Sequence, residues 1–199
     1  MQTKELWFAL DRESSNMGMK EKLKLQLWRC VDGLFFKTSL KMFSGWRVFL
    51  LRLFGAQIGK GCYIAPKATI YIPWNIKIGN YTSIDDYVYI KPRTSITIGD
   101  YVSISTFVHI IPGGHDLRTR NLKSSLSPIL IKDGVFIGAD SYIGGGVTIG
   151  QMAVIGARSL VMKDIPENTI AFGFPCIVRS ERLPQEEYNK YRYNYRDEK

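Results

Sequence analysis

The sequence predicts a mainly β chain that winds as a three-sided coil of short strands. An aliphatic residue returns every sixth position, and a small or β-branched residue stands four positions after it. The aliphatic series is Ile58, Ile64, Ile70, Ile78, Ile84, Ile90, Ile98, Ile104, Ile110, Ile131, Ile137, Ile143, Ile149, Ile155 and Val161. A fixed period kept this long indicates a repeat architecture. A spacing of six fits a short strand followed by a corner, and it fits no helix face.

The irregular intervals give the number of sides. The spacing lengthens from six to eight after Ile70 and again after Ile90, so that a turn of 20 residues repeats. About five such coils are expected, each burying its aliphatic residues against its neighbours. Glycine directly follows the aliphatic residue seven times, as at Gly79 and Gly99. We expect glycine there because the corner needs a positive φ.

The flanks of the repeat have different patterns. Residues 58–166 form the repeat domain, and residues 1–57 are expected to be an N-terminal helical cap. Within that cap, residues 1–16 are a lead-in, and apolar residues at helix-face spacings run from Met17 to about Phe54. Gly33 and the pair Ser44-Gly45 are the expected breaks between short helices.

Two further segments leave the repeat. Residues 112–128 interrupt the third corner as an excursion loop hinged at Gly113-Gly114, and a loop of this length is usually functional. Residues 167–199 form a C-terminal segment that ends in a short helix or tail.

The charge of the chain is strongly basic and uneven. The net charge is +9, and nine lysines and arginines face two acids between Met17 and Lys60. Such a surface favours polyanions, although no nucleic-acid-binding motif accompanies it. The N-terminal helices therefore have two compatible interpretations. They cover the open end of the coil, or they lie on an anionic membrane.

The cysteines and the hydropathy predict a cytoplasmic protein. The chain has an odd number of cysteines, Cys30, Cys62 and Cys176. Their spacing suits neither a disulfide framework nor a metal knuckle. We expect no signal peptide and no membrane span, because no run of 18 apolar residues exists. The expected location is the cytoplasm, with peripheral contact at the inner face of the membrane left open.

The repeat, the segment GWRVFLLRLFGAQIGKGCYI at 45–64 and the closing segment MKDIPENTIAFGFPC at 162–176 resemble the hexapeptide-repeat acetyltransferases. Within that family, the exopolysaccharide O-acetyltransferases of the colanic-acid type are the most similar. The resemblance implies a left-handed parallel β-helix, a handedness that the spacing alone does not give. It also implies a homotrimer, a cleft shared by two subunits and acetyl-CoA as acyl donor, without a metal.

Two residues carry the expected chemistry. His115 follows the two glycines of the excursion and precedes Asp116, and the resemblance makes it the catalytic base. A neutral imidazole can accept the proton of an attacking sugar hydroxyl. The other histidine, His109, should point outward from its strand. Asp85 should stack with the residues 20 positions away, and the resemblance makes it a substrate-binding residue.

The resemblance also implies where coenzyme A binds. The matching positions are Ala139 and Ala157, followed by Met162 and Lys163 near the nucleotide end. Ile177 stands where many members have a basic residue. Arg179 and Arg182 are therefore alternative partners for a phosphate.

The sequence thus predicts an acetyl-CoA-dependent O-acetyltransferase acting on a sugar hydroxyl of an exopolysaccharide, capsule or O-antigen, or of its lipid-linked precursor. Two alternatives stay open: a non-catalytic trimeric scaffold in glycan assembly, and an N-acetyltransferase on an amino-sugar. A zinc hydratase on the same coil would need three histidine-type ligands, and the chain has only two histidines.

Overall fold

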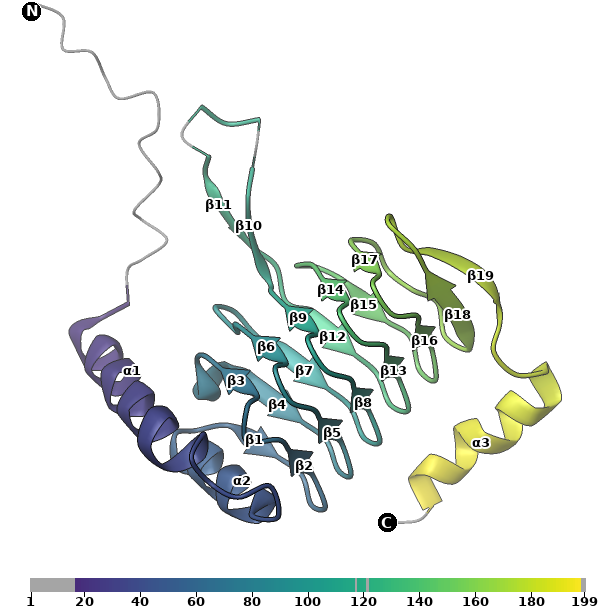
Figure 1. Ribbon diagram of the computed structural model, residues 1–199. Coiled ribbons are helices and arrows are strands. Elements are labelled where there is room, and N and C mark those ends of the chain that lie inside the picture. The colour runs from purple at the N-terminus through teal and green to yellow at the C-terminus, as the bar shows by residue number, and fades with distance from the viewer. Residues whose placement is uncertain (1–16, 117, 121, 198–199) are drawn as a thin grey trace, which may run out of the picture.

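The computed structural model describes residues 17–116, 118–120 and 122–197, and side chains as far as residue 191. The expected lead-in, residues 1–16, lies outside this range. The centre of the molecule is a parallel β-helix with three sheets, flanked by helices at its two ends (Figure 1). Five coils are complete, and a sixth begins where Ile165 bridges Ile149.

Each sheet is a stack of equivalent strands from successive coils. The first sheet contains β1 (Gln57–Ile58), β4 (Ile76–Ile78), β7 (Ile96–Ile98), β12 (Ile129–Ile131) and β15 (Thr148–Ile149). The second contains β2 (Tyr63–Ile64), β5 (Ser83–Ile84), β8 (Ser103–Ile104), β13 (Phe136–Ile137), β16 (Val154–Ile155), β18 (Thr169–Phe172) and the antiparallel β19 (Ile177–Glu181). The third contains β3 (Thr69–Ile70), β6 (Tyr89–Ile90), β9 (His109–Ile110), β14 (Tyr142–Ile143) and β17 (Leu160–Val161).

The repeated aliphatic residues form one continuous core. Ile84 pairs with Ile64 and Ile104 in the ladder of the second sheet, and all three side chains are buried. The same register holds in the other two sheets, for example between Ile90 and Ile110. The hydrophobic period therefore fixes the stacking of coils, because a slip of one residue would turn this row to solvent.

The predicted reason for the corner glycines is wrong. Gly79 does not have a positive φ; a Cβ at this position would lie 2.6 Å from the backbone nitrogen of Asp100 in the next coil. Glycine is required because two backbones approach each other closely. The positive φ falls two residues later, at Tyr81 (52°) and Tyr101 (56°), whose stacked rings lie 5.1 Å apart.

From residue 17 onward, three helical segments precede the β-helix: α1 (Met19–Val31), the π-helix η2 (Asp32–Phe36) and α2 (Ser44–Leu53). Two buried polar side chains tie them to the first coil. Trp28 Nε1 donates to the carbonyl of Ile70 at 2.8 Å, and Arg47 Nε donates to the carbonyl of Ile64 at 2.6 Å. Of the two expected breaks, Gly33 lies inside η2, whereas Ser44-Gly45 begins α2.

Arg47 is fully buried and its guanidinium binds only neutral acceptors. Its Nη atoms donate to Ser39 Oγ and to the carbonyls of Leu40 and Lys41, at 2.8–2.9 Å. Burial lowers the pKa of this guanidinium from its usual value. These bonds hold the linker between η2 and α2 against the β-helix. At the other end, α3 (Gln185–Asp197) follows β19, and a short 3-10 helix, η3 (Pro73–Asn75), lies at a corner.

Candidate active site

The excursion at residues 112–128 is a two-stranded hairpin, where the sequence predicted only a loop. Strand β10 (Gly113–His115) pairs antiparallel with β11 (Ser124–Leu126). The hairpin leaves the β-helix directly after β9, at the edge between the third and first sheets, which we call the third edge. It stands away from the coils in Figure 1. Gly113 is close to Leu126 across the ladder, since a Cβ there would lie 3.1 Å from Leu126 Cδ2.

His115 is exposed on this hairpin, and its ring is oriented by one hydrogen bond. Nδ1 lies 2.8 Å from the carbonyl oxygen of Leu122. A carbonyl can only accept, so Nδ1 carries the proton and donates it to Leu122. The lone pair of Nε2 is then directed away from the hairpin backbone. A general base needs this tautomer, with an unprotonated Nε2. The atom that holds the ring in place is a main-chain carbonyl oxygen.

The carbonyl of Leu122 is itself held by a compact turn. Thr119 Oγ1 donates to the carbonyl of Asp116 and accepts from the backbone N–H of Lys123, both at 2.8 Å. The backbone N–H of Leu122 donates to the carbonyl of Thr119 at 3.1 Å, and Leu122 has a φ of 48°. Thr119 therefore fixes the atom that orients His115. Sequence reasoning missed both Thr119 and Leu122, because a backbone acceptor leaves no residue pattern.

His109 lies outside this hairpin. It is exposed on the outer face of the third sheet, as its place on the strand predicted, and its ring meets that of Tyr89 edge-on at 5.8 Å. The two histidines therefore have different surroundings, and only His115 is held by a backbone carbonyl.

Asp85 lies at a different edge, between the second and third sheets, which we call the second edge. Its side chain is half-buried, and its backbone N–H donates to the carbonyl of Ile104 at 3.0 Å. Ala65 makes the equivalent bond to Ile84 in the coil before. The predicted column of residues 20 positions apart, which includes Ala65 and Asp85, is therefore present. Within one chain, Asp85 and His115 lie at different edges.

The expected donor-binding residues are also divided between these edges. Ala139 and Ala157 follow β13 and β16 at the second edge, and the carbonyl of Ala139 accepts the N–H of Arg158 at 2.8 Å. Met162 and Lys163 follow β17 at the third edge, and both are exposed. The candidate site residues of a single chain thus fall into two groups, or candidate half-sites, one with Asp85 and one with His115.

Comparison with known proteins assigns the family. Residues 128–163 match the model of the bacterial transferase hexapeptide (six repeats). The chain is 38% identical over 164 residues to WcaF of Escherichia coli (strain K12), which is named for acetyl transfer in colanic acid biosynthesis; the match covers 82% of this chain and 90% of that protein. The chain belongs to the hexapeptide-repeat acetyltransferases.

Solved structures agree with this assignment. A hexapeptide-repeat acetyltransferase of Vibrio cholerae O1 biovar eltor, complexed with acetyl coenzyme A, superposes with a TM-score of 0.76 at 27% identity, over 84% of this chain and 91% of that one. A galactoside acetyltransferase in complex with coenzyme A gives a TM-score of 0.71 at 27% identity, over 86% and 87%. The β-helix of this acetyltransferase is left-handed, as in the family.

The acetyltransferase has two candidate arginines near its C-terminus for a phosphate. Arg182 is already bonded to the β-helix, because its Nη1 donates to the carbonyl of Met152 at 2.9 Å and to that of Gly134 at 3.2 Å. Arg179 lies over the ring of Phe172, 4.9 Å from its centroid, on the exposed strand β19. The structure therefore favours Arg179 over Arg182 as a phosphate partner.

Two of the three thiols of this acetyltransferase, those of Cys62 and Cys176, do not resemble nucleophiles. Burial raises the pKa of Cys62 and of Cys176, and the Cys62 thiol donates to the carbonyl of Gly79 at 2.9 Å. Thiols with raised pKa values stay protonated at neutral pH, and only a thiolate attacks a thioester well. This argues against a route through an acyl group on Cys62 or Cys176.

Within residues 17–116, 118–120 and 122–197, no group of three or more His, Cys, Asp or Glu side chains is placed to hold a metal ion. Over the same residues, every helix is too short or too polar to span a bilayer.

Proposed function

We propose that this protein transfers an acetyl group from acetyl-CoA to a sugar hydroxyl in the assembly of an exopolysaccharide, capsule or O-antigen. The observation that carries the proposal is the His115 ring, with Nδ1 bonded to Leu122 and Nε2 free to accept a proton. Nε2 takes the proton of the acceptor hydroxyl as its oxygen attacks the thioester carbonyl. The C–S bond then breaks, and the imidazolium returns the proton to the leaving thiolate.

Acetyl-CoA is the donor, and this chain's residues fit it at two places. Ala139 and Ala157 are small residues on successive coils, so an extended chain can approach the backbone of the second edge. Met162 and Lys163 are exposed beside the third edge, where Lys163 offers a cation to a phosphate. Asp85 accepts hydrogen bonds from hydroxyl groups of the acceptor sugar.

A homotrimer completes the site in this proposal. Asp85 and the two alanines belong to the second edge, whereas His115, Met162 and Lys163 belong to the third. Two copies side by side can bring one second edge against one third edge. Cyclic symmetry then repeats the same cleft at every interface. The two half-sites of one chain support this assembly.

The exposed face of the N-terminal helices supports peripheral binding to the cytoplasmic face of an anionic membrane. Eleven large apolar side chains between residues 19 and 53 are 44–82% exposed: Met19, Leu23, Leu27, Leu34, Phe35, Leu40, Met42, Phe43, Trp46, Phe49 and Leu53. Lysines alternate with them, as in helices that lie in the membrane interface. Large apolar side chains exposed in such number within one segment suit a surface that contacts a membrane or another protein.

Vesicle binding tests the membrane proposal. The protein should sediment with vesicles rich in phosphatidylserine at low salt and detach at high salt, because screening removes the lysine contribution. Phe35→Ser together with Phe49→Ser should weaken binding, and Leu130→Ser, exposed on the first sheet, is the matched control. If the phenylalanine variants instead change the oligomeric state and bind vesicles normally, the face is a subunit contact.

Transfer from acetyl-CoA tests the enzymatic proposal. Thiol release should appear only with a suitable glycan, and His115→Ala should lower kcat by roughly two to four orders of magnitude without unfolding the protein. His109→Ala is the control and should keep normal turnover, since His109 lies outside the hairpin. Normal turnover of His115→Ala would remove this residue from the mechanism.

The same assay separates the alternatives. An O-acetyl product is an ester and is cleaved by mild hydroxylamine, whereas an N-acetyl product resists it. Absence of transfer to every glycan, with a stable trimer that still binds glycan, would favour the non-catalytic scaffold.

A further inference from the structure

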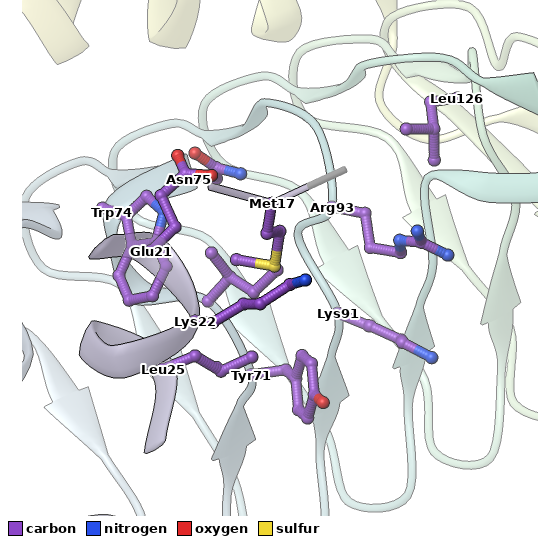
Figure 2. Close-up of a pocket in the computed structure, with 11 residues that line it drawn as sticks. Met17, Glu21, Lys22, Leu25, Tyr71, Trp74, Asn75, Lys91, Arg93 and Leu126 are labelled. Atoms are coloured by element: carbon purple, nitrogen blue, oxygen red, sulfur yellow. The ribbon is translucent and has the colours of Figure 1, made fainter. Parts of the chain in front are cut away.

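A cavity of about 420 Å³ lies at the foot of the hairpin, and we call it the hairpin-foot cavity. It is enclosed by the start of α1 and by the third-edge corners of the first two coils, with Leu126 of β11 on the far side (Figure 2). The lining residues are Met17, Glu21, Lys22, Leu25, Tyr71, Ile72, Trp74, Asn75, Lys91, Arg93 and Leu126. No predicted site residue lines it.

The hairpin turns His115 toward this cavity. Gly113 pairs with Leu126, and His115 pairs with Ser124. Directly opposed residues of an antiparallel ladder share a face, and so do residues two positions apart on one strand. His115 therefore lies on the same face of the hairpin as Leu126, which lines the cavity. Along the hairpin, His115 and Leu126 are offset by two residues, which is a rise of about 7 Å. One sugar ring with its substituent has a comparable length.

The lining of the cavity is basic. Lys22, Lys91 and Arg93 face a single acid, Glu21. Figure 2 shows Lys22 extending from α1 toward the loop that carries Lys91 and Arg93. Neither Lys22 nor Lys91 takes part in the ion pairs Lys37–Asp32, Arg118–Asp116 and Arg158–Asp140 of the described residues.

The remaining lining suits a sugar next to that charge. The rings of Tyr71 and Trp74 offer flat apolar surfaces, and Lys91 Nζ lies 5.7 Å from the Tyr71 centroid. The amide of Asn75 is fixed, because its Nδ2 donates to the carbonyl of Pro92 at 2.9 Å. A neutral acceptor offers no charge to the cations of this lining, whereas an anionic group can pair with Lys22 and Lys91.

We propose that the hairpin-foot cavity binds a phosphate or diphosphate group attached to the acceptor sugar. The acceptor is then a sugar phosphate ester, linked to a nucleotide or to a prenyl carrier, and not a free neutral sugar. The anionic group sits among Lys22, Lys91 and Arg93, and the sugar extends along the hairpin toward His115. This inference rests on the proposed function and names the substrate class of the same site.

Binding measurements test the inference without any acetyl transfer. Pyrophosphate, a nucleoside-diphosphate sugar and a short prenyl-diphosphate sugar are titrated into the full chain by calorimetry. Lys22→Gln with Lys91→Gln should weaken the binding of pyrophosphate at least tenfold. Lys20→Gln with Lys132→Gln removes two exposed lysines outside the cavity and should leave it unchanged. A circular dichroism melt of each variant confirms folding.

The titrations with the two sugar compounds identify the group to which the acceptor sugar is linked. Tighter binding of the prenyl compound indicates a lipid-linked acceptor, and tighter binding of the nucleotide compound indicates a nucleotide-linked one; both support the inference. Equal affinity of the cavity variant and the wild type for pyrophosphate, or no binding of any of the three compounds, would overturn it. Acetyl transfer to a neutral sugar that depends on His115 but not on Lys22 and Lys91 would retain the proposed function and reject only this inference.

Discussion

At the scale of single residues, the proposed chemistry depends on a side chain that the sequence points to and on a backbone atom that the sequence does not reveal. His115 is a candidate because the resemblance places a catalytic histidine in this excursion, and here it follows two glycines and precedes Asp116. Its orientation could not be predicted, because the carbonyl of Leu122 that binds Nδ1 belongs to no particular residue type. Only the folded turn shows that Thr119 positions this carbonyl.

Thr119 should therefore act as a positioning residue. Thr119→Val removes the hydroxyl that bonds Asp116 and Lys123, so the Leu122 carbonyl loses its fixed place. We expect kcat to fall about tenfold, the effect of roughly 1.4 kcal/mol on the barrier, with little change in KM for acetyl-CoA. Thr119→Ser keeps the hydroxyl and should restore most of the rate. Equal kcat for the valine and wild-type enzymes would show that the turn does not control His115.

At the scale of elements, the periodic strands were predictable and the exceptions were not. The six-residue period gave the three sheets and about five coils because every inward position is occupied by the same class of side chain. The period carries no information on segments that leave it. The pairing of β10 with β11 and the π-helical turn at Asp32–Phe36 therefore appear only in the structure.

The corner glycines test the physical explanation of the coil. Gly79→Ala would place a methyl group against the backbone of Asp100, so the stacked coils must shift. We expect a loss of about 1–3 kcal/mol of unfolding free energy, as for overpacked cores, measured by denaturant titration. Gly33→Ala is the control, since nothing lies within 4 Å of the added atom. A neutral Gly79→Ala would show that close backbone approach is not what requires glycine here.

At the scale of the whole molecule, the arrangement of the site is the part that sequence reasoning resolved least. The sequence named six site residues without showing that they occupy two edges of one chain. Topology decides this, because residues that follow the second sheet cannot meet those that follow the third across a packed core. The hairpin-foot cavity escaped prediction for a related reason: α1 and two corners enclose it, and they lie far apart in the sequence.

A complementation experiment tests the shared site most directly. His115→Ala and Asp85→Ala proteins are purified separately, unfolded and refolded together in equal amounts. Each variant alone should be nearly inactive. In randomly mixed trimers, an interface regains an intact site when one copy supplies Asp85 and its neighbour supplies His115, so about a quarter of wild-type activity should return. A mixture no more active than the separate variants would contradict a site assembled from two edges of neighbouring copies.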